Sequence, residues 1–273
     1  MELLFLGTAA SEGFPNPFCS CENCQKAREE GKKSIRLRSS LLIDNEILID
    51  FGPDILSSVN RFGMELSDIK HILITHGHSD HLFFKNFEYR NPIFSGTFDL
   101  LPHIDLIVPD RLGAVIKEKV DLPKISLMSV TPFVSLHLNG YIVYTLKAKH
   151  TPGYDETPLN YIVEKDGVKM LYGVDSGKFL AESIEYIKNE IKYLDIVILD
   201  ATMGFNKKYE FHMGYEEVLE TKEILQKEGI IDDKSKIVVT HFSHLHNPEH
   251  TELEKIYDKH NIIAAFDGLK IKK

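Results

Sequence analysis

The chain has 273 residues, of which 43% are apolar, and a formal net charge of −9 at pH 7. This acidic balance argues against polynucleotide binding, which requires clustered Lys and Arg, but it leaves a small anionic substrate possible. No apolar run approaches the ~20 residues of a membrane span, and the N-terminus lacks the basic start of a signal peptide. We expect a cytoplasmic protein without a membrane segment, folded as a single domain over residues 1–273.

Apolar runs alternate with amphipathic segments along the chain. Strands are expected near residues 2–6, 40–50, 71–75, 105–108, 125–130, 134–146, 159–173, 195–200, 236–240 and 262–266. Helices are expected over residues 54–61, 110–119, 179–192, 214–228 and 249–260. Tight polar turns at Asp44-Asn45, Asn139-Gly140 and Asp166-Gly167 predict hairpins. Hairpins early in each half, followed by strands that alternate with helices, predict an α/β fold.

Three cysteines lie within six residues near the N-terminus, as Cys19, Cys21 and Cys24. Thiolates this close cannot easily bridge one another, but they can bind one tetrahedral zinc ion whose fourth ligand comes from elsewhere. His244 is the first candidate for that ligand and His246 the second. Three buried thiols without a metal are the alternative, which the polar, turn-rich surroundings disfavour.

A second cluster of ligand-type residues follows the predicted strand that begins at His71. The string runs Thr75-His76-Gly77-His78-Ser79-Asp80-His81. Imidazole and carboxylate suit zinc, manganese or ferrous iron. The pair His76 and His78 can bind one ion, while Asp80 and His81 turn toward a second. A solvated polar loop is the alternative, but four such residues in six positions favour a metal site.

This string resembles the His-x-His-x-Asp-His signature of the metallo-β-lactamase superfamily, and the resemblance spans nearly the whole chain. Other polar residues end predicted strands in that family's order, namely Asp50, His150, Asp175 and His241. The resemblance implies an α/β fold of four layers, an αββα sandwich, here with a small N-terminal Cys-rich zinc loop.

The resemblance also implies a dinuclear site and its ligands. One metal ion would be bound by His76, His78 and His150, the other by Asp80, His81 and His241, with Asp175 bridging. The two divalent ions would be zinc or manganese, with iron as a further alternative, and a bridging hydroxide would attack the substrate. Asp200 is a rival to Asp175 as the bridge. Asp50 is expected to orient ligand histidines, with a plain strand-end turn as the alternative.

The segment from Gly7 to Pro15, the cysteine cluster and the string Thr240–His244 resemble the phosphoribosyl cyclic phosphodiesterases. That branch implies a metal-dependent phosphoric diester hydrolase that acts on a small, cyclic phosphodiester and also carries a structural zinc. A tRNA 3′-processing endonuclease is one alternative, although Asp200-Ala201-Thr202 differs from its His-Glu-Ala-Thr motif. A non-catalytic carrier protein of cofactor biosynthesis on the same fold is another.

Asp80 and His212 are the catalytic candidates. His212 precedes the predicted helix 214–228, whose N-terminal amides favour anions, so it is expected to protonate the leaving oxygen or to bind phosphate. A surface or N-capping histidine is the alternative. The side chains of Arg36, Arg38 and Arg90 could also meet a phosphate, but an arginine of this kind is more often a solvated charge. The oligomeric state stays open, with a homodimer as the commonest expectation.

Overall fold

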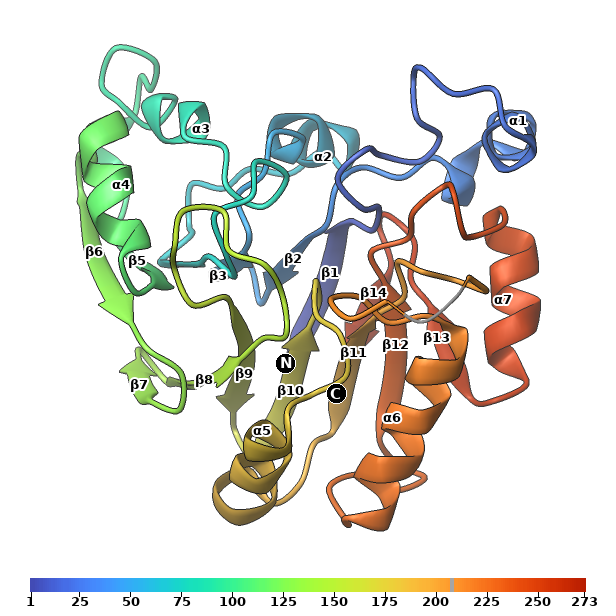
Figure 1. The fold of residues 1–273 in the computed structure, drawn as a ribbon. Helices are drawn as coiled ribbons and strands as arrows, with labels where there is room; N and C mark the ends of the chain where they lie inside the picture. Colours follow the sequence, from blue (N-terminus) through green and yellow to red (C-terminus); the bar gives the residue numbers. More distant parts are fainter. Residues whose placement is uncertain (207–208) are drawn as a thin grey trace.

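The computed structural model describes residues 1–206 and 209–273, which form two seven-stranded sheets with helices outside them (Figure 1). The first sheet has the order β14 (Lys270–Lys272), β1 (Glu2–Gly7), β2 (Ser40–Ile43), β3 (Ile47–Ile49), β4 (His71–Leu73), β5 (Ile104–Pro109) and β6 (Ile125–Val130). The second has the order β13 (Ile262–Ala264), β12 (Lys236–Thr240), β11 (Ile196–Asp200), β10 (Val168–Gly173), β9 (Leu159–Lys165), β8 (Tyr141–Lys147) and β7 (Ser135–Leu138).

Each sheet changes from antiparallel to parallel pairing along its width. In the first sheet, β14 to β3 are antiparallel and β3 to β6 are parallel. In the second, β7 to β10 are antiparallel and β10 to β13 are parallel. Because β3 and β4 are parallel, as are β10, β11 and β12, their carboxyl ends meet at shared sheet edges.

Helices connect or flank these strands. The α-helices are α1 (Glu22–Glu30), α2 (Ile55–Arg61), α3 (Lys85–Glu88), α4 (Leu112–Lys119), α5 (Ala181–Tyr186), α6 (Tyr215–Lys227) and α7 (His250–Asp258). Short turns of other helix types are η1 (Lys32–Ser34), η2 (Phe98–Leu100) and η3 (Ile187–Ile191). No helix within residues 1–206 and 209–273 has both the length and the apolar character needed to cross a membrane.

Three apolar cores lie between the four layers, and the side chains of β11 take part in two of them. Ile196 and Ile198 point into the core between the two sheets, where they join Tyr161 and Leu3. The alternate residue Val197 packs on the other face with side chains of α5 to α7. A third core lies between the first sheet and α2 and α4. Strands buried on both faces explain the continuous apolar runs in the sequence. The αββα sandwich is confirmed, while the single-domain boundary stays a prediction.

The expected hairpins form where the polar turns predicted them. Each of the three long apolar runs divides into two strands at its turn, and Asp44, Asn139 and Asp166 have positive φ angles of 51°, 44° and 51°. Helices α1 and α3 and strand β14 were not among the predicted elements. In α1 only Cys24 and Ala27 are buried, so the helix lacks an apolar stripe.

Candidate metal centres

Loops that leave the carboxyl ends of six strands carry the candidate ligands. Asp50 follows β3, the string 75–81 follows β4, His150 follows β8, Asp175 follows β10, Asp200 ends β11 and His241 follows β12. Three of them have left-handed backbones, with φ of 65° at Asp50, 54° at Asp175 and 64° at His241. A residue other than glycine adopts the left-handed conformation only at a cost in conformational energy. Residues held in such strained conformations are often found at functional sites.

The first cluster joins His76, His78, His150 and Asp175, whose ligand atoms lie within 4.8 Å of one another. The Nδ1 atom of His78 lies 2.8 Å from His76 Nε2 and 3.2 Å from His150 Nε2. Burial lowers the pKa of His78, and it lowers that of His150 to about 4. Both imidazoles are therefore neutral near pH 7, which is the form that binds metal ions.

The second cluster joins Asp80, His81, Asp175 and His241. His81 Nε2 lies 3.2 Å from Asp80 Oδ2 and 2.9 Å from Asp175 Oδ2, and His241 Nε2 lies 3.7 Å from the same Asp175 oxygen. Burial alone would raise the pKa of Asp80, but the His81 imidazole holds it well below its usual value. Burial would lower the pKa of His81, but Asp80 and Asp50 raise it well above its usual value. A proton and a cation would therefore compete for His81.

The outer nitrogens of the candidate ligands are already bound to the protein. Thr75 Oγ1 lies 3.0 Å from His76 Nδ1 and donates to Asp50, while Thr202 Oγ1 lies 2.8 Å from His241 Nδ1 and donates to Asp200. Two matching carboxylate–threonine–histidine chains thus fix two rings, with each Nε2 facing inward.

His81 and His150 are oriented in the same way. His81 Nδ1 lies 2.7 Å from Asp50 Oδ2, as expected for a residue that orients a ligand. His150 Nδ1 lies 3.4 Å from the carbonyl oxygen of Phe211. Within the described residues, the buried Nε2 atom of His241 lacks a hydrogen-bond partner, and the Nε2 atom of His81 faces the carboxylate oxygens of Asp80 and Asp175. Unpartnered buried polar atoms are rare, so the donor set fits two cations.

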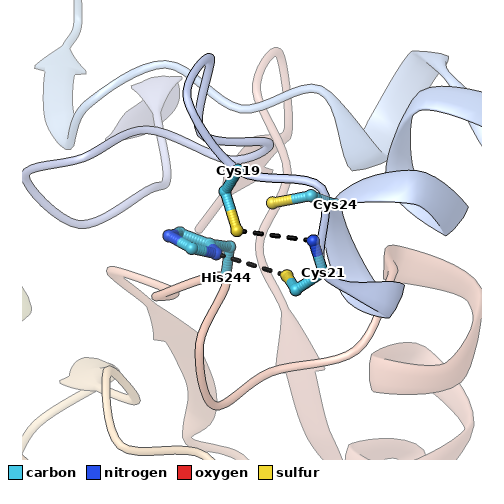
Figure 2. Close-up of side chains that lie close together, drawn as sticks. All are labelled: Cys19, Cys21, Cys24 and His244. Carbon is cyan, nitrogen blue, oxygen red and sulfur yellow. Dashed lines mark hydrogen bonds between the residues drawn. The ribbon is translucent and has the colours of Figure 1, made fainter.

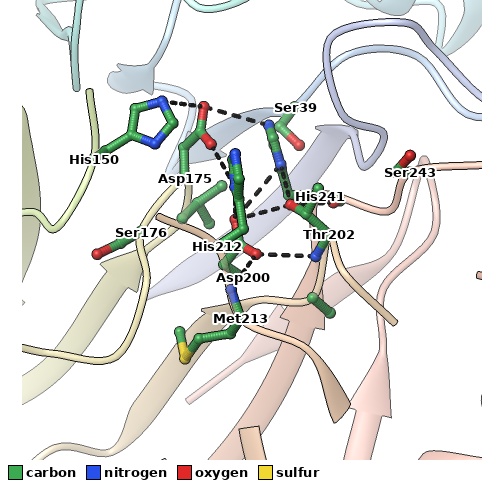
Figure 3. A network of polar contacts seen from close by, with 12 residues as sticks. Ser39, His150, Asp175, Ser176, Asp200, Thr202, His212, Met213, His241 and Ser243 are labelled. Carbon is green, nitrogen blue, oxygen red and sulfur yellow. Dashed lines mark hydrogen bonds and ion pairs between the residues drawn. The ribbon is translucent and has the colours of Figure 1, made fainter. Parts of the chain in front are cut away.

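Asp175 is the residue that the two clusters share (Figure 3). Its Oδ2 atom lies 3.3 Å from His76 Nε2 in the first cluster and 2.9 Å from His81 Nε2 in the second. Burial would raise the pKa of Asp175, but the surrounding imidazoles, His241 first, hold it well below its usual value. Asp200 instead accepts hydrogen bonds from the backbone N–H groups of Thr202 and Met213. The geometry therefore favours Asp175 over Asp200 as the bridge.

His212 lies against the second cluster and faces two carboxylates (Figure 3). Its Nδ1 atom is 3.0 Å from Asp175 Oδ1 and 3.3 Å from Asp200 Oδ2. Although burial lowers the pKa of His212, Asp200 and Asp175 raise it to about 11. At the start of α6, Glu217 Oε2 accepts the Gly214 N–H at 3.0 Å and Gly204 O accepts the Tyr215 N–H at 2.7 Å, so these two N–H groups already have partners. The role of His212 as proton donor or phosphate-binding residue stays a prediction.

Glu156 is a buried carboxylate that was not among the predicted site residues. Its Oε1 atom accepts the N–H groups of Gly77 at 2.7 Å and Gly153 at 2.9 Å, and its Oε2 atom accepts that of Tyr154 at 2.6 Å. A Cβ atom at Gly153 would lie 2.6 Å from the backbone carbon of Gly77, so the two loops meet backbone to backbone. Glu156 thus ties the loop that carries His76 and His78 to the loop after His150.

The cysteine cluster forms a separate group of ligand atoms (Figure 2). The Sγ atoms of Cys19, Cys21 and Cys24 and a ring nitrogen of His244 lie within 4.8 Å of one another. Cys21 Sγ is 3.6 Å from His244 Nδ1. Burial would raise the pKa of Cys21, but His244 and the backbone lower it to about 6. Three sulfurs and one imidazole suit tetrahedral zinc. The second candidate, His246, lies outside the cluster, with its Nδ1 atom 3.1 Å from Asn206 Nδ2.

A pocket of about 490 Å³ opens onto the two histidine clusters. It is lined by Ala10, Ser11, Glu12, His78, Ser79, Asp80, His150, Thr151, Asp175, Thr202, His212 and His241. Among the described residues, no lysine or arginine lines it. The three arginines that could have met a phosphate have other partners: Arg36 donates to Thr8 Oγ1 and Ala265 O, Arg38 pairs with Asp54 at 2.8 Å, and Arg90 donates to a backbone carbonyl.

Comparison with known proteins connects this geometry to a family. The family model described as "Beta-lactamase superfamily domain" matches residues 45–242. A crystal structure described as a new diphosphatase from the PhnP family is 24% identical, with a TM-score of 0.75, over 100% of this chain and 97% of that one. Zinc-bound PqqB from Methylobacterium extorquens is 16% identical, with a TM-score of 0.77, over 100% of both chains.

A third similar structure is the short form of human tRNase Z. It is 18% identical, with a TM-score of 0.65, over 100% of this chain and 99% of that one. No protein of curated function matches the sequence. At these identities, the structural likenesses establish the fold alone.

Proposed function

The chain belongs to the β-lactamase superfamily, and we propose that within it the protein is a dinuclear metal-dependent hydrolase that cleaves a small, cyclic phosphodiester. One observation carries this proposal: a single carboxylate, Asp175, lies between two sets of inward-facing imidazoles. One cation site would be formed by His76, His78 and His150, and the other by Asp80, His81 and His241.

The donor set admits zinc or manganese, since imidazole and carboxylate suit both. When bound, two divalent ions would supply Lewis acidity toward a phosphoryl oxygen and a water molecule. The chains from Asp50 to His76 and from Asp200 to His241 keep both imidazoles in fixed orientations. Such preorganisation is needed because small displacements of catalytic groups cost large factors in rate.

His212 is our proposed proton donor to the leaving oxygen. Its Nδ1 atom faces Asp175 and Asp200, so Nε2 is the nitrogen left to meet a substrate in the pocket. The same two carboxylates favour the protonated imidazole. A proton held at Nε2 could pass to the departing alkoxide as the P–O bond breaks.

The pocket favours a small diester over a polynucleotide. Its volume is about 490 Å³, and its wall within the described residues contains no lysine or arginine that could follow a phosphate backbone. The similarity to tRNase Z therefore supports the shared fold rather than a shared substrate. A non-catalytic carrier role is disfavoured because all seven ligand positions are present and converge.

We also propose that Cys19, Cys21, Cys24 and His244 bind a structural zinc ion. A closed set of four ligands leaves no position for a substrate, which is typical of structural zinc. Three free thiols also suit a reducing compartment, so the cytoplasm is the proposed location.

Hydrolysis of bis(4-nitrophenyl) phosphate by the purified, metal-loaded protein tests the proposed activity. We expect turnover with zinc or manganese, and a loss of more than about 100-fold in Asp80→Ala because a metal ligand is removed. Asp155→Ala is the matched control, because the Asp155 side chain is 87% exposed and, among the described residues, its ion pair is with exposed Arg111. Turnover retained in Asp80→Ala, or absent from the metal-loaded wild type, would contradict the proposal.

A further inference from the structure

Glu12 places a carboxylate in the wall of the candidate active-site pocket. It belongs to the loop that follows β1, and it lines the pocket together with Ser11, Ser79 and Thr151. The Glu12 side chain is 24% exposed, so it is neither buried away from a ligand nor free in solvent. It belongs to neither of the two histidine clusters, and the chemistry proposed above does not use it.

One carboxylate oxygen of Glu12 is held by the protein. Ser243 Oγ donates to Glu12 Oε1 at 2.5 Å, and His244 Nε2 lies 3.8 Å from the same oxygen. The other nitrogen of His244 faces Cys21 Sγ at 3.6 Å. The imidazole that joins the cysteine cluster therefore also faces the anchored oxygen of Glu12.

The second oxygen of Glu12 is available to a ligand. Within the described chain, the hydrogen-bond partner of Oε2 is the Ser11 hydroxyl at the long distance of 3.5 Å. No described lysine or arginine forms an ion pair with Glu12, and the neighbouring wall side chains Ser11, Ser79 and Thr151 are small and polar. A carboxylate in this setting accepts a hydrogen bond from a hydroxyl strongly and repels a second anion.

We propose that Glu12 determines substrate specificity by accepting a hydroxyl group carried by the organic part of the diester, which in a cyclic diester is the carbon skeleton that bears both ester oxygens. This part would be neutral and hydroxylated, such as a glyceryl or sugar moiety, and one that carries a further phosphate would be disfavoured. This inference rests on the proposed phosphodiesterase function and defines its substrate class. Glu12 acts on recognition of this organic part and takes no part in the breaking of the P–O bond. In an acyclic diester used as a probe, the second arm takes the place of this organic part.

Three 4-nitrophenyl phosphodiesters with the same leaving group test the proposal, with a butyl, 3-hydroxypropyl or 3-phosphooxypropyl second arm. The first two arms differ by a methyl group in place of a hydroxyl. We expect wild-type kcat/KM for the hydroxypropyl ester to exceed that for the butyl ester by about tenfold or more, as for one hydrogen bond to a charged acceptor. Glu12→Ala should reduce this ratio of kcat/KM values to about one, whatever its effect on the butyl ester itself.

Glu12→Gln separates charge from shape. It keeps an acceptor oxygen, so part of the hydroxyl preference should remain, while hydrolysis of the phosphorylated arm should improve by about fivefold or more as the negative charge is lost. The matched control is Glu22→Gln, since Glu22 lies on α1, pairs with Lys26 and is 78% exposed. Equal metal content in all variants would show that the metal sites are intact.

Binding of the inert esters methyl 3-hydroxypropyl phosphate and methyl butyl phosphate, measured by calorimetry, decides the inference independently of turnover. Tighter binding of the hydroxylated ester that is lost in Glu12→Ala supports it, even if bis(4-nitrophenyl) phosphate is not hydrolysed. The same ratio of affinities in wild type and Glu12→Ala, or no binding of either ester, would overturn it.

Discussion

Replacing Glu156 by glutamine should destabilise the protein, because one carboxylate serves three backbone donors. Its two oxygens accept the N–H groups of Gly77, Gly153 and Tyr154 at 2.6–2.9 Å. Glutamine has one acceptor oxygen, and its amide group would face at least one N–H donor to donor. Losing one or two charge-assisted bonds costs about 2–4 kcal/mol, or about 5–15 °C in melting temperature.

The same substitution should weaken the proposed metal site. Gly77 lies between His76 and His78, so a loosened loop moves two ligands of the first cluster. We expect metal affinity to fall by about 10–100-fold, as for other residues that support ligands. Melting curves with and without metal, together with metal titrations, separate the effect on the fold from the effect on the site.

The pH dependence follows from the pKa of Glu156. Burial raises this pKa, but the backbone N–H groups of Gly153 and Gly77 lower it below its usual value of 4.5. A carboxyl group with a depressed pKa in the folded state stabilises the protein above the unfolded-state pKa, and this stability is lost as pH falls through the folded-state pKa. The stability difference between wild type and Glu156→Gln should therefore be constant near pH 7 and shrink below about pH 4.5.

Asp155→Asn is the control for this experiment. Asp155 is the preceding residue, and its exposed ion pair with Arg111 is worth less than about 1 kcal/mol. If the melting temperatures of Glu156→Gln and Asp155→Asn both equal that of the wild type, the three hydrogen bonds of Glu156 do not hold the two loops together. The predicted loss of stability is then refuted.

Two further variants address the remaining parts of the site. Cys21→Ser should release about one zinc ion per chain and lower the melting temperature by about 10 °C, and unchanged metal content by elemental analysis would reject the structural zinc. His212→Ala should slow diesters with alkyl leaving groups by about 100-fold or more and bis(4-nitrophenyl) phosphate by less than about tenfold, because only the former need a protonated leaving oxygen. Equal slowing of both would assign His212 to substrate positioning.

The fold could be predicted largely because strands that are buried on both faces appear in the sequence as runs rich in apolar residues. The run 159–173 carries apolar residues on both sides of its Asp166-Gly167 turn, and it forms the paired strands β9 and β10. The edge strand β14 gave no such signal, since only Ile271 of its three residues is buried. Short edge strands depend on a partner strand, here β1, that lies more than 200 residues away in the chain.

The candidate ligands could be predicted from the sequence because they lie close together in it or at the ends of predicted strands. The residues that hold those ligands in position could not be predicted in this way. Glu156 is one acidic residue in a loop, and its role depends on Gly77 N–H, 79 residues distant. The partners of the arginines could not be predicted for a related reason, because a guanidinium donates both to phosphate and to backbone carbonyl oxygens. Only the fold places Arg36 beside Ala265 O instead of in the pocket.

The loop after β12 explains why a remote cysteine cluster belongs in this architecture. His241 points into the second cluster and His244 into the cysteine cluster, three residues apart. Phe242 between them pairs by backbone hydrogen bonds with Thr8 and Ala10 of the loop after β1. The loop that leads to the cysteines is thus joined to the loop that carries a ligand histidine. Fixing His244 among the thiolates therefore restrains the pocket wall at Glu12 and the position of His241 together, without any contact between the cysteines and a substrate.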